Sequence, residues 1–579
     1  MKRVRKGLLF TIVVLLVLLV VATGAFAAPK RVLIVVMDQM HPEYAKQYNM
    51  TNVLWLMNNG ANFQNAIVGD MASETVVSHN VMVSGMLPKN QGWSDEAFRD
   101  TGGVLSSAYP ARTTDMYVTG DLGYSDFAAL VAAGGYKKLG TYLHEATPGS
   151  TVACVGEKSY QVRSMTAGSS DFGVFLGSTK NATNGGDPAL ISLLGGAYRA
   201  PGGAPSTGAV PTYITGDTRF TINSDPNNDY GTLTTSPAWI YPEDGDRMVP
   251  GYIEGHLGGD NWVADATMAI MKNTAGTAND WSGLFVNFGA IDKSGHMWGG
   301  GEADNLKTYN WDPNNWLDNM THESFIAKNA DNQLGRLIGT LKALGEFKDT
   351  LIVVTADHGS TAATRHFYGN DAQGAGDFNW YWGNSATDGD YYATPVAEMS
   401  PAIQTLLGNS TVGGNISFSY QSTGIETWLK SFTMPEKKAA AKVMRTVPGV
   451  IATYVKADDG SAYILDSAKT KTKMTAAEKG WWKSHAQMLV NTMAWSGSAD
   501  VVGLLADRTS YGAFGDHGGA QKDVQRVPMI FYNPSLMTAQ RGAEIHTVDI
   551  MPTVMKAMGI AVDPAAKIMD GKAYMLATK

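Results

Sequence analysis

The feature that most constrains this sequence is a set of five short apolar segments, each about as long as one buried β-strand. They are "RVLIVVMD" (31–38), "TVACVG" (151–156), "GLFVNFGAID" (283–292), "DTLIVVTADHG" (349–359) and "VPMIFYN" (527–533). Between them lie helical patterns, such as the leucines at helical spacing in "ADNQLGRLIGTLKALG". This alternation predicts an α/β fold with a mostly parallel central sheet flanked by helices, and we expect all five segments to be parallel strands.

Two long regions interrupt the alternation. One, at about 160–260, is rich in Gly, Asn, Ser, Thr and Pro, and the other, at about 362–500, is rich in aromatic residues and Gly. Regions of this length are usually functional lids or inserted subdomains. We therefore predict a single α/β domain over residues 28–579 that carries two insertions.

Residues 1–27 have the three-part layout of a signal peptide. A basic start, "MKRVRK", is followed by an apolar run and by the small-x-small sequence "AFA" at 25–27. The predicted location is therefore the periplasm or the outside of the cell. An uncleaved membrane anchor is the alternative, because about 20 apolar residues can span a bilayer. No later segment has a membrane-spanning pattern.

Charge and cysteine content exclude some functions. The net charge of −8 argues against broad nucleic-acid binding through a basic surface, although a small nucleotide substrate remains compatible with it. Cys154 is the only cysteine, so no disulfide can form within the chain. It lies in an apolar run, which favours packing over a nucleophilic role.

Acidic and imidazole side chains gather where the apolar segments end. They are Asp38, Asp292 with His296 four residues later, Asp357 with His358, and His517 in the Gly-rich "FGDHGGAQ". Each of them alone is more typical of a turn or a loop. Because the carboxyl ends of parallel strands meet at one edge, the set together predicts a cluster of carboxylates and imidazoles. Mixed nitrogen and oxygen ligands suit zinc or a similar divalent ion.

Five sequence blocks resemble the alkaline phosphatase superfamily, nearest its type I phosphodiesterase and nucleotide pyrophosphatase branch. They are "VVMDQM", "TVVSHNVMVSGMLPKNQG", "GAIDKSGHMWG", "VVTADHG" and "GDHGG". The resemblance implies an alkaline-phosphatase-like fold and a metal-dependent phosphoric ester hydrolase. It also implies two divalent metal ions, for which zinc is expected. One ion would be held by Asp292, His296 and His517, and the other by Asp38, Asp357, His358 and the oxygen of Thr75.

Thr75 has two readings. In isolation it is typical of a helix cap, because a hydroxyl residue here precedes an apolar helical run. The resemblance implies that Thr75 is the nucleophile, which attacks phosphorus and forms a covalent phospho-threonine that water then hydrolyses, and one residue can be both cap and nucleophile. A helix N-terminus there would also attract phosphate. Ser73 is a competing hydroxyl at the wrong place in the block, and His79 is interpreted as structural.

Two positions depart from the relatives' pattern and bear on the substrate. Phosphodiesterase relatives usually have an Asn where this chain has Glu96, and a carboxylate donates a hydrogen bond to phosphate only when protonated. Monoesterase-type relatives carry a Lys-x-Arg pair, of which this chain has Lys158 but Tyr160 in place of the arginine. We take Lys158 and Glu96 as candidate substrate contacts; they could also pair with each other.

The leading hypothesis is an exported hydrolase of phosphodiester or nucleotide-like compounds. A phosphomonoesterase is the alternative, favoured if Lys158 binds a terminal phosphate. A metal- or ligand-binding protein without turnover is the alternative of another class. The sequence argues against a sulfatase. Sulfatases of this superfamily need a C/S-x-P-x-R signature to form formylglycine, whereas Cys154 is followed by Val-Gly-Glu and a threonine cannot be converted in this way.

Three further features carry only weak expectations. The stretch "DPNNDYG" (225–231) loosely resembles the start of a calcium loop but lacks its bidentate Glu. His366, His485 and "FNWYW" (378–382) could line a pocket, although packing is the more ordinary role for each.

Overall fold

The computed structural model describes residues 28–105, 115–175, 257–276, 280–292, 295, 319–362, 365–366, 410–468, 476–511 and 515–577. The predicted signal peptide (1–27) and the possible calcium loop (225–231) lie outside these residues. Within the described ranges, no helix combines the length and the apolar character needed to cross a membrane.

A central sheet of eight strands forms the core, in the order β19-β2-β18-β8-β1-β7-β5-β6. The strands are β1 (Arg31–Met37), β2 (Ala61–Ile67), β5 (Thr151–Gly156), β6 (Phe172–Phe175), β7 (Trp281–Phe288), β8 (Thr350–Thr355), β18 (Met529–Tyr532) and β19 (Ala539–His546). The pairs made by β1 with β7 and β8, and by β5 with β6 and β7, are parallel. The predicted mostly parallel α/β fold is confirmed.

The strand from the segment 527–533 corrects one detail of that prediction. β18 runs antiparallel to both of its neighbours, β8 and β2. The loop before it carries His517, which lies at the carboxyl edge of the sheet beside Asp292. A parallel strand would have to start at the opposite edge, and such a crossover needs a dozen or more residues. The eleven residues between His517 and Met529 also form the short helix α20 (Lys522–Gln525), so the chain enters the sheet from the near edge.

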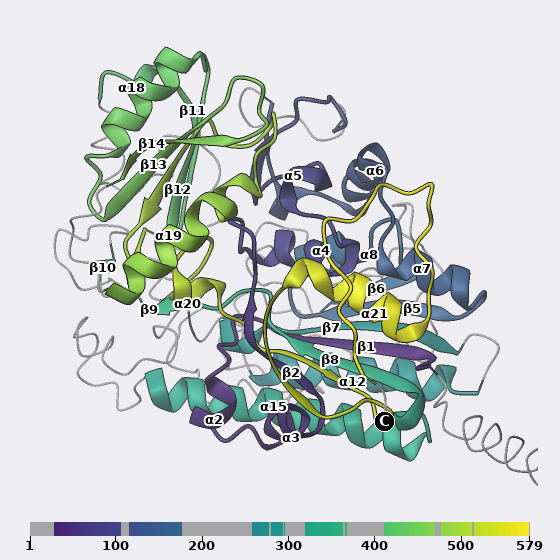
Figure 1. Cartoon of the computed structure of the whole chain (residues 1–579). Coiled ribbons are helices and arrows are strands. Elements are labelled where there is room, and N and C mark those ends of the chain that lie inside the picture. The colour runs from purple at the N-terminus through teal and green to yellow at the C-terminus, as the bar shows by residue number, and fades with distance from the viewer. Residues whose placement is uncertain are drawn as a thin grey trace, which may run out of the picture.

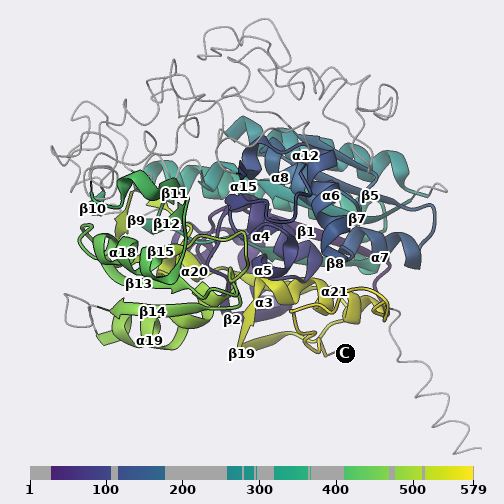
Figure 2. The same cartoon turned by 90° about the horizontal axis from the view of Figure 1, so that it is seen from above.

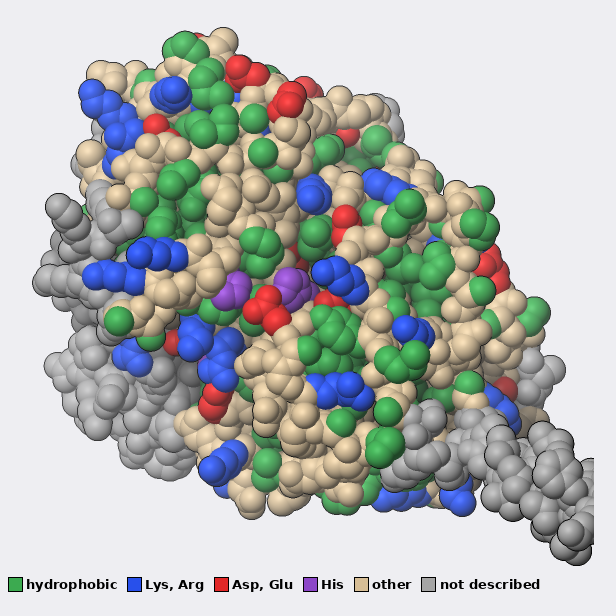
Figure 3. All heavy atoms as spheres, in the orientation of Figure 1, with side chains coloured by type: hydrophobic (Ala, Val, Ile, Leu, Met, Phe, Trp, Pro, Cys, Tyr) green, Lys and Arg blue, Asp and Glu red, His purple; other side chains and the backbone are tan. Residues whose placement is uncertain are grey.

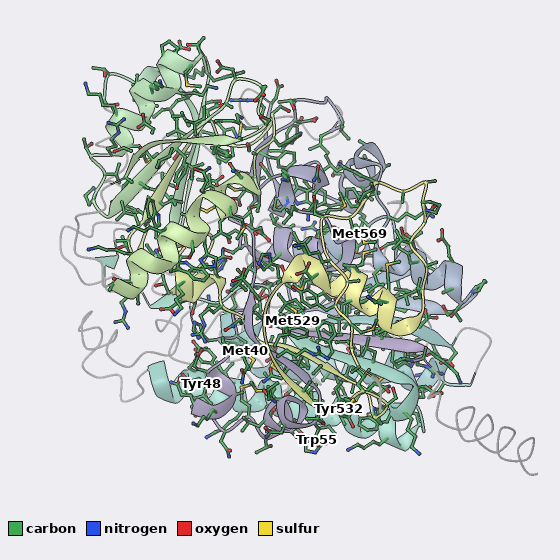
Figure 4. All side chains as sticks on the ribbon, viewed as in Figure 1. Met40, Tyr48, Trp55, Met529, Tyr532 and Met569 are labelled. Atoms are coloured by element: carbon green, nitrogen blue, oxygen red, sulfur yellow. The ribbon has the colours of Figure 1, made fainter. Side chains whose placement is uncertain are left out.

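Helices cover both faces of the central sheet (Figure 1). One face carries α3 (Thr51–Asn59), α12 (Leu257–Thr274) and α15 (Asn319–Ala343), and the other carries α4 (Thr75–Ser84), α7 (Leu139–Ala146), α8 (Ser159–Thr166) and α21 (Ile550–Met558). The predicted leucine pattern lies in α15, where Leu334, Leu337 and Leu341 are buried. Where α3 packs on β18, the Trp55 and Tyr532 rings lie 4.9 Å apart (Figure 4).

A second, antiparallel sheet lies to one side of the central sheet (Figure 2). Its strands, in the order β11-β12-β15-β13-β14, are β11 (Ile416–Gln421), β12 (Gly424–Leu429), β13 (Val450–Lys456), β14 (Tyr463–Ala468) and β15 (Val501–Leu505). Helices α18 (Met434–Met444) and α19 (Ala476–Asn491) belong to the same part of the chain. Much of the predicted insertion at 362–500 is therefore ordered structure. By contrast, α8 and β6, at the start of the predicted insertion 160–260, belong to the central layers.

Short elements complete the described fold. They are the pairs β3 (Ala97–Arg99) with β4 (Met116–Val118), β9 (Thr361–Ala362) with β17 (Gly515–Asp516) and β10 (Arg365–His366) with β16 (Thr509–Ser510), and the helices α2 (Tyr44–Gln47), α5 (Pro88–Gln91) and α6 (Tyr124–Gly134). The β9–β17 pair matters for the site, because it brings the His517 loop beside the segment that follows His358.

Candidate active site

Three neighbouring strands of the central sheet end in buried aspartates. Asp38 follows β1, Asp292 follows the turn after β7, and Asp357 follows β8. All three side chains are fully buried. The convergence follows from the sheet order, since β7, β1 and β8 are adjacent and parallel, so that their carboxyl ends meet.

Helix α4 delivers Thr75 to this cluster. All ten residues of the helix are buried, and the helix begins at Thr75, so that Glu74 is the residue in the N-cap position. The Thr75 hydroxyl accepts a hydrogen bond from Lys158 Nζ at 3.1 Å and lies 3.5 Å from His358 Nε2. The interpretation of Thr75 as a helix cap is therefore wrong, because Glu74 is in the N-cap position and Thr75 is the first residue of the helix.

Two groups of side chains, which share His358, have ligand atoms close enough to hold a metal ion. They are Asp292, His358 and His517 in the first group, and Asp38, Asp357 and His358 in the second. His358 Nε2 lies 3.3 Å from Asp357 Oδ2 and 3.6 Å from Asp38 Oδ1. His517 Nε2 lies 3.5 Å from Asp292 Oδ1. The imidazole rings of His358 and His517 stack with their centroids 3.6 Å apart.

The protonation chemistry of these groups fits cation binding. Asp38 Oδ1 and Asp357 Oδ2 are buried and accept no hydrogen bond from any of the described residues. Burial, together with the neighbouring Asp357 carboxylate, raises the pKa of Asp38 to about 7. Burial raises the pKa of Asp357 to about 6 and lowers that of His358 well below its usual value. A buried carboxylate oxygen without a hydrogen-bond donor is costly, and a divalent cation bound to these two oxygens would reduce that cost.

Lys158 lies between the two ligand groups. It follows β5, and its ammonium is 2.7 Å from Asp292 Oδ2 and 2.9 Å from Asp38 Oδ2. Glu96, the other candidate substrate contact, accepts a hydrogen bond from the backbone amide of Val76 in the first turn of α4, at 3.4 Å. At the start of α4, Lys158 therefore contacts the Thr75 hydroxyl and Glu96 contacts the Val76 amide.

The sequence of the chain fits a known family over most of its length. A family model described as type I phosphodiesterase / nucleotide pyrophosphatase matches residues 32–423, which is more than half of the chain. The chain belongs to this family. It is therefore a phosphoric ester hydrolase of the alkaline phosphatase superfamily, and the resemblance drawn from the five sequence blocks is confirmed. A search of curated protein sequences gives no match.

Solved structures align with this phosphodiesterase-family chain over nearly its whole length. A crystal structure of alkaline phosphatase PafA with four substitutions aligns at a TM-score of 0.54 and 14% identity, covering 95% of this chain and 99% of that one. Murine ectonucleotide pyrophosphatase / phosphodiesterase 5 aligns at a TM-score of 0.49 and 11% identity, covering 94% of this chain and 97% of the murine one. The first of these alignments confirms the predicted alkaline-phosphatase-like fold.

Gln39 is a site residue that sequence reasoning missed. Its backbone amide donates to Asp357 Oδ1 at 3.2 Å, and its side-chain Nε2 donates to Asp292 Oδ1 at 3.1 Å. The residue has φ of 67°, a region that non-glycine residues rarely adopt and that often marks functional sites. The sequence signal for this role was the carboxamide side chain of Gln39, which comes directly after Asp38 at the end of β1.

Asn287 and His79 were also overlooked as parts of the site. Asn287 lies inside the fully buried strand β7 and donates to Asp38 Oδ2 at 3.0 Å. His79 Nδ1 donates to the backbone oxygen of Thr75 at 2.7 Å, and its Nε2 lies 3.0 Å from Asn287 Nδ2. The polar Asn287 in an otherwise apolar strand was a readable signal. His79 was interpreted as structural, and its contacts place it beside the candidate ligands.

The remaining predicted residues lie elsewhere or outside the described part. His296, the segment 378–382 and the His366 side chain are outside the described residues. His485 stacks on Trp481 at 3.7 Å, away from the cluster. The Ser73 hydroxyl bonds to the backbone of Gly519. Cys154 is buried, and burial raises the pKa of its thiol to about 11, which agrees with the packing role.

Proposed function

We propose that the chain is an exported, metal-dependent hydrolase of phosphodiester or nucleotide-like compounds that acts through a covalent phospho-threonine at Thr75. The observation that carries the proposal is the position of the Thr75 hydroxyl, which lies 3.1 Å from Lys158 Nζ and 3.5 Å from His358 Nε2 at the edge of two ligand groups. A hydroxyl in that position is a nucleophile beside the groups that can activate it.

Two divalent ions, zinc by ligand type, belong to the proposal. The residues that would hold them are Asp292, His296 and His517 for one ion, and Asp38, Asp357, His358 and Thr75 for the other. Their support is the set of buried carboxylate and imidazole atoms that meet in the two candidate groups. Such ions lower the pKa of a hydroxyl and stabilise negative charge on phosphoryl and leaving oxygens.

The protein side chains then have the following roles. The Thr75 hydroxyl loses its proton to water and its oxygen attacks phosphorus, while the bond from phosphorus to the leaving oxygen breaks and the leaving oxygen takes up a proton from water. The product is phospho-threonine and a free alcohol or nucleotide. Water then attacks the same phosphorus, which releases phosphate or a phosphomonoester and restores Thr75. The N-terminus of α4 favours negative charge nearby, although the backbone amide of Val76 already donates to Glu96.

A phosphomonoesterase is a second candidate, and one observation favours it. Lys158 Nζ lies within hydrogen-bond distance of the nucleophile, where a terminal phosphate would carry an additional charged oxygen. The opposing observation is the Glu96 carboxylate at the first turn of α4, which disfavours a dianion more than a diester. The two candidates therefore differ in their substrates and share the chemistry of Thr75.

Export and domain organisation are part of the same proposal. Residues 1–27 would be removed as a signal peptide, and residues 28–579 would fold as one domain with one insertion that starts after β6 and a second at about 362–500. N-terminal sequencing of the protein recovered from the periplasm or the medium tests the cleavage. A mature chain that begins at Ala28 is the expected result.

Hydrolysis by matched variants tests the mechanism. Wild-type protein, Thr75→Ala and Thr75→Ser would be assayed with p-nitrophenyl phosphate and bis-p-nitrophenyl phosphate, with metal content measured on the same samples. We expect chelator-sensitive turnover, about a 1,000-fold loss or more in Thr75→Ala, and partial activity in Thr75→Ser. Ser73→Ala, which removes the neighbouring hydroxyl, is the control. Undiminished hydrolysis by Thr75→Ala would exclude this nucleophile, and the ratio of the two substrates selects between the candidates.

A further inference from the structure

The two ring nitrogens of His517 face two different carboxylates. Nε2 is directed at the ligand cluster, 3.5 Å from Asp292 Oδ1, and Nδ1 lies 2.8 Å from Glu74 Oε2. The backbone oxygen of Ser73 is a further neighbour of Nδ1, at 3.3 Å. An imidazole whose Nδ1 carries the proton toward Glu74 therefore presents the lone pair of Nε2 to the cluster.

We infer that Glu74 is a positioning residue that fixes the tautomer and the orientation of His517 for metal binding. This inference rests on the proposed function, in which His517 holds one of the two ions. A metal-binding histidine commonly donates its second N–H to a carboxylate, and this contact raises the basicity of the ligand nitrogen. Glu74 has the geometry for that role and stands outside both candidate ligand groups.

The backbone around His517 is shaped to allow this contact. Gly518 has φ of 76°, and a Cβ atom built there would meet Glu74 Oε1 at 1.8 Å. The amide of Gly518 donates to the backbone oxygen of Ser73 at 3.1 Å. A larger residue at 518 would therefore be strained and would push Glu74 away from the imidazole.

The second sheet holds the same loop from the other side. The backbone amide of Thr423, in the turn between β11 and β12, donates to the backbone oxygen of His517 at 3.1 Å. Its hydroxyl donates to the same oxygen at 3.0 Å. The imidazole is thus oriented by the N-cap residue of α4 on one side, and its backbone is held by the inserted sheet on the other.

Fold stability alone gives little reason for a carboxylate at position 74. The Glu74 side chain is only 3% exposed, and its Oε1 accepts no hydrogen bond within the part of the chain that the structure describes. It also makes no side-chain hydrogen bond that caps α4. Burying a carboxylate with one unpaired oxygen costs stability, so the contact with His517 is the feature that accounts for its presence.

Zinc affinity of the purified full-length protein tests the inference. Wild type, Glu74→Ala and Glu74→Gln would be equilibrated in zinc buffers, and bound zinc would be counted as free zinc is lowered. We expect one of the two ions to bind about 10–100-fold more weakly in Glu74→Ala and the other to be unaffected. Glu74→Gln keeps an acceptor oxygen, so its loss should be smaller.

The control is Glu426→Gln, which alters another buried carboxylate near Glu74 whose hydrogen bond goes to Asp95. Its two zinc affinities should match those of the wild type. Cobalt substitution adds a spectroscopic readout, in which the visible band of one ion should shift in Glu74→Ala.

Unchanged zinc affinity in Glu74→Ala would overturn the inference. So would equal weakening of both ions with a lower melting temperature of the zinc-free protein, because that pattern indicates a structural role. A wild type without zinc would refute the proposed function first.

Discussion

Lys158 donates a hydrogen bond to Thr75 Oγ1 at 3.1 Å while its ammonium also contacts Asp292 and Asp38, at 2.7 and 2.9 Å. One cation therefore touches the proposed nucleophile and one carboxylate from each ligand group. It reduces the repulsion among the buried carboxylates, and it lies where a phosphoryl oxygen would approach Thr75. Its relative importance for stability and for substrate binding can be separated by substitution.

Replacing Lys158 with Ala should reduce monoester hydrolysis more than diester hydrolysis. A hydrogen bond to a charged group contributes about 1.5–3 kcal/mol, so kcat/KM for p-nitrophenyl phosphate should fall about 10–100-fold. The fall for bis-p-nitrophenyl phosphate should be smaller, because a diester lacks the additional charged oxygen. Steady-state kinetics with both substrates gives the comparison. Equal losses would show that Lys158 does not discriminate between them.

Replacing Glu96 with Gln should increase the rate of hydrolysis. The Glu96 carboxylate accepts a hydrogen bond from the Val76 amide at the start of α4. Burial and the nearby Asp95 raise the pKa of Glu96. Its negative charge opposes a phosphate, whereas a carboxamide supplies a donor. We expect kcat/KM for the diester to rise about 10-fold, on the scale of one charged hydrogen bond. Glu145→Gln, an exposed carboxylate on α7, should leave the rate unchanged. A lower rate in Glu96→Gln would show that the carboxylate assists the reaction.

The central sheet was predictable because buried parallel strands are continuous apolar runs. Segments 31–38, 151–156 and 349–359 correspond to β1, β5 and β8 within a residue or a few. The direction of β18 was not predictable from its own sequence. The direction depends on the edge of the sheet at which the preceding loop lies. The apolar pattern of a strand is the same whether the strand runs parallel or antiparallel to its neighbours.

The part of the site formed by the aspartates after the strand ends was predictable from the sequence. Asp38, Asp292 and Asp357 converge because their strands are adjacent. The contacts of Glu74 and Gln39 were not predictable, because each joins segments that are hundreds of residues apart in the chain. No local pattern encodes such a pairing, and it appears only when the strands are in register.

Replacing Gly518 with Ala should weaken zinc binding. The positive φ of Gly518 disfavours any Cβ, and the new methyl group would collide with Glu74 Oε1. We expect about a 10-fold loss of affinity for one ion, with a melting temperature a few degrees lower. Gly542→Ala is the matched control, because a Cβ atom built at Gly542 would meet no atom of the described residues within 4 Å. Zinc titration and thermal unfolding of both variants give the result, and equal behaviour of the two would contradict the expectation.

A buried lysine away from the site should make stability depend on pH. The Lys138 side chain is fully buried, and its Nζ donates to the backbone oxygen of Ser164 at 2.6 Å. Burial lowers its pKa from 10.5 to about 7, an effect that Cys154 only partly opposes. Between those two pH values the unfolded chain binds more protons at this position than the folded chain. The free energy of unfolding should therefore rise with pH through this window, by up to about 1.4 kcal/mol per pH unit from this group.

Lys138→Met removes this dependence and should stabilise the protein at neutral pH. The gain at pH 7 should be about 2–4 kcal/mol, which is the cost of burying the charge less about 1 kcal/mol for the lost hydrogen bond. It should disappear as the pH approaches 10, where the lysine is neutral when folded and the unfolded chain also begins to lose its proton. Denaturant unfolding of both proteins at pH 7, 8.5 and 10 gives the difference. Lys556→Met, at an exposed lysine of α21, should show no such trend with pH. A gain that stays constant across the three pH values would mean that the methionine stabilises the core by packing and that the Lys138 charge contributes nothing.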